Sequence, residues 1–246
     1  MDLTHGNSPF PATRWTEVVK VCQKDDVACR QRALGGLCQA YWYPLYAFAR
    51  RLGRSRHDAQ DLAQGFFCYA LERDLFAAAD REVGKLRTFL LRVFQRYIGD
   101  ADERERALKR GGGLEVFSLE FQDGEQRYVH EPLDGDTPET LYQRAWAMAV
   151  LRAALEELRT TEQHGGGGEV FNVLEAFLDP DAKAEGSYPE AAAALGVTVE
   201  NVRQMVSRLR KKFRVCLRQQ IAATLNNPSS SQIDEELSDL KAALRH

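Results

Sequence analysis

The sequence contains no apolar run that approaches the ~20 residues needed to span a bilayer, and its N-terminus lacks the basic-then-apolar pattern of a signal peptide. These two absences argue against a membrane-inserted or secreted protein. We therefore expect a cytoplasmic protein with no membrane insertion.

Paired cysteines are also missing. The chain has five cysteines, an odd number, and none of them forms a C-x-x-C pair. A reduced compartment with structural thiols fits this pattern best. A zinc site among Cys22, Cys29 and Cys38 is the alternative, but the spacing does not favour it, and we expect no metal and no cofactor.

Catalytic groupings are absent as well. No Ser/His/Asp or Cys/His pairing stands out, and four isolated histidines lie in or beside expected loops: His5, His57, His130 and His164. The run of glycines from Gly165 to Gly168 follows no strand and so does not predict a phosphate-binding loop. The sequence therefore predicts a protein that is not an enzyme.

Strand-like alternation and internal repeats are missing too, whereas helical periodicity recurs along the chain. The 246 residues are 44% hydrophobic, enough for one large or two small cores. The formal net charge of -3 conceals separate basic and acidic stretches. Basic patches on a slightly acidic chain indicate that a protein partner supplies part of any affinity for DNA.

The stretch from Ser187 to Arg218 predicts two helices joined by a tight turn. Ser187 and Glu190 have the spacing of a capping box, and the Ala-rich run after them ends at Gly196, which permits the positive φ of a turn. Thr198 can cap a second helix. Its apolar stripe comprises Val202, Met205, Val206, Leu209, Phe213 and Leu217. This pattern is typical of a DNA-binding helix-turn-helix.

The polar faces of that second helix carry the expected DNA contacts. Between Val199 and Arg218 seven basic residues accompany one acidic residue. Side chains in the first turns can contact base edges and the later cations can contact phosphates. The candidates are Thr198, Glu200, Asn201, Arg203, Gln204, Ser207, Arg208, Lys211 and Lys212. The alternative is a solvated basic helix over an ordinary core.

The N-terminal half predicts three longer helices after an extension at residues 1–29, in which Thr13 can cap a short helix. The first spans about Arg30 to Leu52, with Pro44 inside it, and a second, capped by Ser55, runs to about Leu71. In the second helix, three-residue steps place Asp58, Asp61 and Gln64 on an outward acidic and amide face. Such a face is either simply solvated or a docking surface.

The third helix spans about Lys85 to Lys109 and interleaves basic residues with aromatic ones. That combination suits phosphate contact and base stacking on single-stranded nucleic acid. A surface helix with internal salt bridges and buried aromatics remains the alternative.

The remainder of the chain predicts a linker, a helix and a tail. Residues 111–136 carry seven acids against a single Arg127, which indicates a flexible acidic linker. Thr137 and Pro138 mark the start of a further helix, and another spans Glu169 to Leu178. The tail at residues 227–246 contains an amphipathic helix from Ile233 to Leu244, as a partner-binding extension or packed on its own domain.

The order of these elements resembles the extracytoplasmic-function (ECF) group of the sigma-70 family, the promoter-recognition subunits of bacterial RNA polymerase. Four stretches carry the resemblance: YWYPLYAFARR from Tyr41, DAQDLAQGFF from Asp58, KLRTFLL from Lys85 and YPEAAAALGV from Tyr188. The second and fourth are the most specific. The resemblance covers about residues 30 to 225.

It implies an all-α fold with two small helical domains joined by the acidic linker. Residues 30–110 would be a region 2-like domain that docks on core RNA polymerase and opens the minus-ten promoter element. Residues 137–226 would be a region 4-like domain that ends in the helix-turn-helix and binds the minus-thirty-five element as duplex. The implied partners are core polymerase and promoter DNA, and such factors often have an anti-sigma factor or another regulator.

By position, the resemblance assigns residues to these tasks. The polymerase-binding residues would be Asp58, Asp61, Gln64 and Phe67, and the minus-ten contacts would be Lys85, Arg87, Arg92, Arg96, Tyr97 and Arg104. The sequence departs from the common pattern at Arg96, where many relatives have Asn, in its Gly165 loop and in its C-terminal helix. The alternative function is a stand-alone helix-turn-helix regulator with an N-terminal sensing or dimerisation domain.

Overall fold

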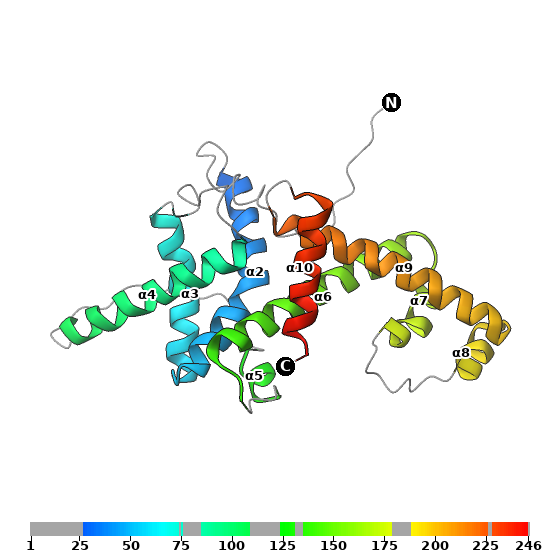
Figure 1. Cartoon of the computed structure of the whole chain (residues 1–246), viewed down its shortest axis with the longest axis horizontal. Coiled ribbons are helices and arrows are strands. Elements are labelled where there is room, and N and C mark those ends of the chain that lie inside the picture. Colours follow the sequence, from blue (N-terminus) through cyan, green and yellow to red (C-terminus); the bar gives the residue numbers. More distant parts are fainter. Residues whose placement is uncertain are drawn as a thin grey trace. The chain divides into compact units, whose positions relative to one another are not determined.

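The fold was derived from a computed structural model, which describes residues 27–73, 75, 85–108, 124–130, 135–178, 188–225 and 228–245. Over these ranges the chain is helical, with no strand, as the sequence predicts (Figure 1). The expected short helix after Thr13 lies outside the described residues.

The described helices form two compact units. The first unit contains the described residues up to Ala149 and those from Ile221 onward, and the second contains Val150–Gln220. The division falls inside one long helix, α6 (Pro138–His164), and near the end of another, α9 (Val199–Ala223). The units therefore differ from the expected domains at 30–110 and 137–226, because the start of α6 and the C-terminal helix belong to the first unit.

The first unit is built on α2 (Val27–Arg51), α3 (Arg56–Glu72) and α4 (Leu86–Leu108). All side chains from Tyr41 to Ala49 in α2 are buried, and α2 continues as one helix through Pro44. An aromatic cluster joins the three helices, since Phe94 packs edge-on against Phe48 at 6.1 Å and against Phe66 at 5.2 Å between ring centroids. This cluster fixes which faces of α3 and α4 point outward.

Capping residues start these helices where the sequence predicts. The amide of Asp58 donates to the Ser55 hydroxyl at 3.1 Å, and the amide of Thr140 donates to the Thr137 hydroxyl at 3.1 Å. In each case a hydroxyl accepts from one of the amides that lack a partner in the first helical turn. Local chemistry therefore determines the starts of α3 and α6.

A short helix, α5 (Gly124–His130), forms within the stretch expected to be a flexible linker. Arg50 of α2 donates to Glu125 through Nε at 3.1 Å and through its NH2 nitrogen at 2.9 Å, and Tyr128 is buried. The expectation of an unstructured linker is thus wrong for residues 124–130, because contacts with α2 stabilise them. The neighbouring linker residues 111–123 and 131–134 lie outside the described part.

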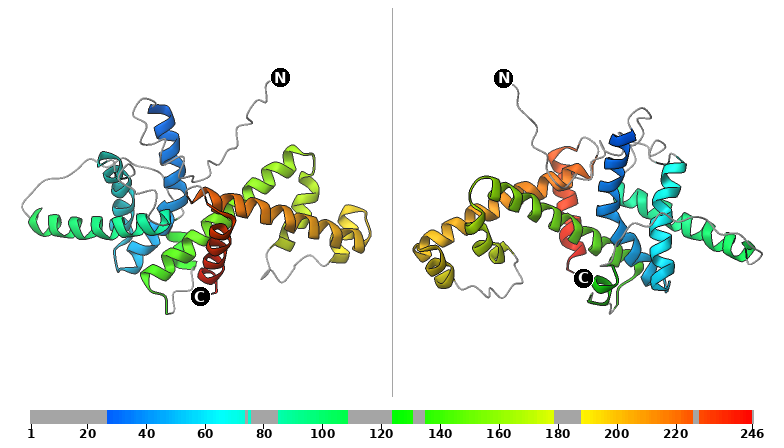
Figure 2. Two further views of the ribbon diagram at one scale, coloured as in Figure 1. Left: turned by 45° about the horizontal axis from the view of Figure 1, so that its top comes forward. Right: turned by 180° about the vertical axis from the view of Figure 1, so that it is seen from behind.

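The C-terminal helix α10 (Ser230–Ala243) packs on the first unit. It begins three residues earlier than predicted, because Ser229 and Gln232 form a capping box with each other's backbone amides. Its Glu236 and Leu240 are 1% and 2% exposed. Figures 1 and 2 show α10 crossing α6, and the first part of α6 belongs to the same unit as α10.

The second unit contains the last part of α6, α7 (Gly168–Leu174), the 3-10 helix η1 (Glu175–Leu178), α8 (Tyr188–Leu195) and most of α9. The predicted helix from Glu169 to Leu178 therefore forms, with a tighter last turn. Leu158, Phe171 and Leu174 pack with buried residues of α8 and α9 in one core. That core holds α8 and α9 together.

Candidate nucleic-acid interface

The α8–α9 pair has the local geometry that its sequence predicts. Gly196 lies between the helices with φ of +65°, a conformation that side chains with a Cβ rarely adopt. The amide of Asn201 then donates to the Thr198 hydroxyl at 3.3 Å, which caps α9. Ser187, the expected cap of α8, lies outside the described residues.

Small and branched side chains bring the two helices together. Ala191 and Ala192 of α8 are buried, and so are Val202 and Val206 of α9. The rest of the predicted apolar stripe is buried or packs against the same cluster: Met205, Leu209, Phe213 and Leu217, joined by Cys216. With one face of α9 committed to the core, the opposite face is left for solvent or a ligand.

The outward face of α9 is exposed along its first four turns. Glu200, Gln204, Ser207 and Lys211 follow one another at steps of four, three and four residues, so they form one row. Asn201, Arg203 and Arg208 flank this row and are also exposed. Most of the residues expected to contact duplex DNA are thus brought together on one helix face.

The cations of α9 differ in how strongly the protein itself holds them. Arg210 donates to the Phe177 carbonyl oxygen at 2.9 Å and 3.2 Å, and Lys212 forms an ion pair with Glu162 at 2.7 Å. By contrast, no side-chain hydrogen bond or ion pair engages Arg208, Lys211 or Arg214 within the residues described. These three are the cations of α9 best prepared to meet an anion.

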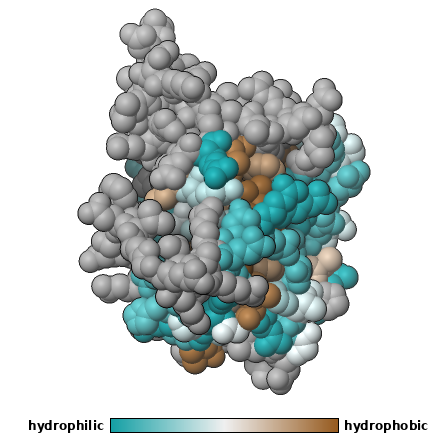
Figure 3. Space-filling view, turned by 90° about the vertical axis from the view of Figure 1, so that its left-hand side faces the viewer, coloured by the Kyte–Doolittle hydropathy of each residue, from teal (hydrophilic) through white to brown (hydrophobic). Residues whose placement is uncertain are grey.

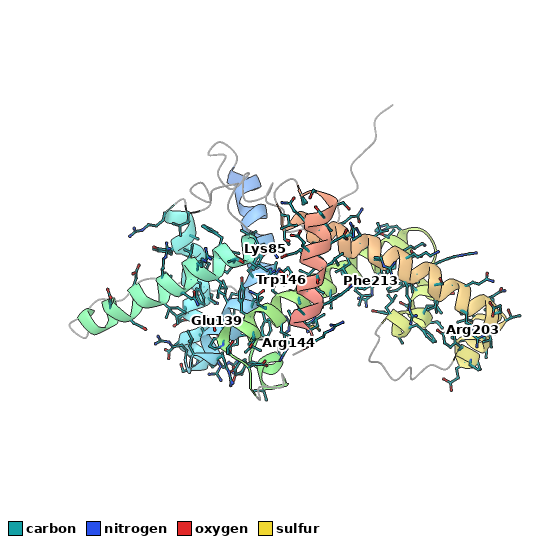
Figure 4. All side chains as sticks on the ribbon, in the orientation of Figure 1. Lys85, Glu139, Arg144, Trp146, Arg203 and Phe213 are labelled. Atoms are coloured by element: carbon teal, nitrogen blue, oxygen red, sulfur yellow. The ribbon has the colours of Figure 1, made fainter. Side chains whose placement is uncertain are left out.

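Arg203 is exposed but oriented. Its guanidinium lies 3.6 Å from the carboxylate of Glu200 and over the ring of Tyr188, 5.8 Å from the ring centroid. Tyr188 is held in turn against Phe177, with 4.8 Å between centroids. Figure 4 shows Arg203 beside α8. This role of Tyr188 was not expected, because nothing in the local sequence pattern predicts which residue its ring contacts.

Some of the residues expected to contact the minus-ten element are exposed, and others pack inside the protein. Arg92 and Arg96 are exposed on α4, whereas the ring of Tyr97 is half-buried and packs on Phe66 and Tyr69. The side chain of Arg104 lies outside the described residues. A Cβ at Gly65 would lie 2.5 Å from the Tyr97 hydroxyl oxygen, so α3 and α4 approach closely there. Tyr97 is thus a packing residue with one partly accessible edge.

The other two expected minus-ten residues are engaged within the protein. Arg87 is 7% exposed, pairs with Glu236 at 2.7 Å and lies over the ring of Trp146 at 4.4 Å from its centroid. Lys85 pairs with Glu236 at 2.6 Å and also with Asp239. The expectation that the Arg87 side chain points outward is therefore wrong, because it is buried beside the acids of α10, and its role as a DNA contact stays a prediction.

The four residues expected to bind polymerase also differ in exposure. Asp58 and Asp61 are exposed on α3, but Gln64 and Phe67 are 5% and 2% exposed. Three-residue steps fall short of a helical turn by 0.6 residue each, so two steps rotate the side chain by about a third of a turn. Gln64 consequently faces the core, and the prediction of one outward row was wrong at this position.

The surface around α3 and α4 is otherwise polar. Hydrophilic side chains predominate among the described residues on the face shown in Figure 3, with small apolar groups between them. In the described ranges no cluster of three potential metal ligands is present. No helix in those ranges is long and apolar enough to cross a membrane.

Comparison of the chain with protein-family models, curated proteins and solved structures finds no match. A functional assignment therefore depends on the geometry of the two units and on the resemblance seen in the sequence.

Proposed function

We propose that this protein is an ECF-type sigma factor that directs core RNA polymerase to specific promoters. The observation that carries the proposal is the outward face of α9, a polar and basic row on a helix that follows a capped three-residue turn. A helix presented in this way fits the major groove of duplex DNA, which admits an α-helix. In this proposal α8 and α9 form the helix-turn-helix for the minus-thirty-five element.

Within this face, position along α9 separates two kinds of contact. Asn201, Arg203 and Gln204 lie in the first turns, where the N-terminal part of a recognition helix meets base edges. Arg208 and Lys211 follow one turn later and have no competing partner among the described residues, which suits them to phosphates. Glu200 orients Arg203 and can accept a hydrogen bond from a cytosine amino group.

The polymerase-binding part of the proposal depends on α3. Asp58 and Asp61 are its exposed acids and can meet a basic docking surface on core polymerase. Gln64 and Phe67 are assigned to the core that supports this face and not to the contact itself. Among the minus-ten candidates whose side chains the structure describes, Arg92 and Arg96 are exposed.

A stand-alone helix-turn-helix regulator is the second candidate. Burial of Gln64, Phe67 and Arg87 favours it, because these residues are expected contacts of a sigma factor that lie inside the first unit. The α8–α9 face would serve such a regulator equally well. In that case the first unit would sense a ligand or form a dimer.

Reconstituted transcription separates the two functions. The protein is mixed with core RNA polymerase and a genomic promoter library, and transcript starts are read. A sigma factor binds core polymerase and produces starts that share upstream sequence elements. A regulator instead shifts duplex operator DNA without polymerase and adds no promoter-specific starts, which would overturn the proposal.

A further inference from the structure

The start of α4 and the C-terminal helix α10 are joined by a cluster of charged groups. Arg87 donates two hydrogen bonds to the Glu236 carboxylate, from Nε at 2.7 Å and from its NH2 nitrogen at 3.1 Å. Lys85 forms an ion pair with the same carboxylate at 2.6 Å. Asp239, one turn later, accepts a hydrogen bond from Arg87 at 2.8 Å and also pairs with Lys85. Two carboxylates of α10 thus neutralise two cations that lie about 150 residues away in sequence.

Arg87 is further positioned by α6. Its guanidinium lies over the Trp146 ring and donates to Gln143, and the Tyr142 hydroxyl donates to the Arg87 carbonyl at 2.9 Å. Figure 4 shows Lys85 and Trp146 close to α10. The arrangement is a prepared anion site, because planar guanidinium and ammonium donors converge on the carboxylate oxygens as they would on phosphate oxygens.

The helix that supplies these carboxylates has one fully buried apolar side chain, Leu240, and two half-buried ones, Ile233 and Leu237. Leu240 and Glu236 are its buried side chains, whereas Asp239 is half-exposed, and most other positions from Ser230 to Leu244 are exposed. An element with little buried apolar surface opens at a lower free-energy cost than the global unfolding of the protein. The ion pairs with Lys85 and Arg87 therefore add to the contacts that hold α10 in place.

We propose that α10 is a built-in acidic cover that competes with the phosphates of single-stranded promoter DNA for Lys85 and Arg87. The proposal rests on the assignment of α4 as a DNA-binding helix. In the covered state Glu236 and Asp239 form ion pairs with both cations. A nucleic-acid strand can bind Lys85 and Arg87 only when α10 moves away. The cover lowers the affinity of the free protein for single strands.

The test uses the full-length chain and a short fluorescent single strand of mixed sequence. Glu236→Gln with Asp239→Asn removes both charges but retains side-chain size, and Asp239→Asn alone leaves the buried Glu236–Arg87 pair intact. Glu235→Gln, an exposed acid of the same helix, is the matched control. Circular dichroism and melting establish that each variant is folded, and Asp239→Asn decides the test if the double variant is not.

The double variant should bind the strand at least about tenfold more tightly, and its plot of log affinity against log salt should steepen by about 1.4, for two more phosphates neutralised on a single strand. Asp239→Asn should show part of this gain and Glu235→Gln little. Adding Lys85→Ala to the double variant should remove part of the gain. Unchanged affinity and salt slope in folded variants would overturn the proposal.

Hydrogen exchange supplies a second measurement on the unmodified protein. Saturation with the single strand should lower the protection of amides from Ser230 to Ala243, and unchanged protection despite binding at α4 would overturn the cover. This result is independent of polymerase. A gain in strand binding without any promoter-specific transcription would support the cover and remove the sigma-factor assignment, while normal transcription with no effect of the α10 variants would do the reverse.

Discussion

Arg50 and Glu125 are joined by two charged hydrogen bonds, 3.1 Å from Nε to Oε2 and 2.9 Å from the NH2 nitrogen to Oε1, although 75 residues separate them. Tyr46 donates to the same carboxylate, and Arg50 also lies over the Tyr128 ring. This bidentate contact holds α5 on α2. It makes the stability of the first unit dependent on an ionised Glu125.

We therefore expect acid to destabilise the first unit. Burial raises the pKa of Glu125, but the hydrogen bonds from Arg50 and Tyr46 lower it by a larger amount. The pKa of Glu125 therefore lies below its ordinary value of 4.5. The pKa of Asp239 is likewise lowered from 3.8: burial raises it, and the contacts with Lys85 and Arg87 outweigh that effect. Because both folded values are depressed, this stability is complete above the ordinary values and is lost as the pH falls through the folded ones. Urea unfolding from neutral pH down to pH ~3 measures it.

The same titration with Glu125→Gln is the control. Gln cannot ionise, so the variant should be less stable at neutral pH and should lose less free energy of unfolding on acidification. An equal loss in the variant and the unmodified protein would show that Glu125 does not contribute to the acid sensitivity.

Contacts that are close in sequence were predictable, and those distant in sequence were not. Ser55, Thr137 and Thr198 mark helix starts because each hydroxyl meets an amide three residues ahead. Helix α5 has only seven residues, too few to be stable alone, and it forms because Arg50 and Trp42 meet it from α2. No pattern within 111–136 contains that information.

The candidate site shows the same division. The outward face of α9 follows from helical periodicity, and the polar residues expected opposite the apolar stripe are exposed, whereas their contact with DNA stays a prediction. Gln64 is buried and not outward, because three-residue spacing falls short of a full helical turn. Arg87 was misplaced for a different reason, since its partners Glu236 and Asp239 belong to a tail helix whose docking position the sequence does not indicate.

Substitution of Gly124 tests how closely α5 approaches α2, and Gly99 in α4 provides the comparison. A Cβ at Gly124 would lie 2.8 Å from Cη2 and 2.9 Å from Cζ3 of Trp42, so Gly124→Ala should destabilise the protein by about 1–3 kcal/mol through overpacking. A Cβ at Gly99 in α4 meets nothing within 4 Å, so Gly99→Ala should stabilise it by about 0.5–1 kcal/mol. Urea unfolding measures both. Equal effects of the two substitutions would contradict the close packing of Gly124 on Trp42.

The two kinds of contact proposed for α9 should respond differently to substitution. Arg203→Ala should weaken binding to the preferred duplex by ~1–3 kcal/mol. The loss should be confined to one base pair of the site, where the protein should no longer prefer one base over the others. Lys211→Ala should weaken binding to all duplexes alike and reduce the salt slope by about 0.9. Fluorescence anisotropy with a set of single-base variants measures both. Lys241→Ala on α10 is the control, and an unchanged site preference in Arg203→Ala would exclude Arg203 from base contact.

The docking face of α3 should be separable from the fold that supports it. Asp61 is exposed and lies away from the aromatic cluster, so Asp61→Arg should shift the free energy of unfolding by less than ~0.5 kcal/mol. Asp58 is less suitable, because it accepts a hydrogen bond from the Ser55 hydroxyl at 2.7 Å in the first turn of α3.

A new cation at position 61 would oppose a basic docking surface, and like-charge contact at an interface costs several kcal/mol. We expect Asp61→Arg to keep its circular-dichroism spectrum and melting temperature but to lose both capture of core polymerase and promoter-specific transcription. Glu235→Arg reverses an exposed acid on α10 and should retain both activities. Normal capture of core polymerase by folded Asp61→Arg would remove the docking assignment and favour the stand-alone regulator.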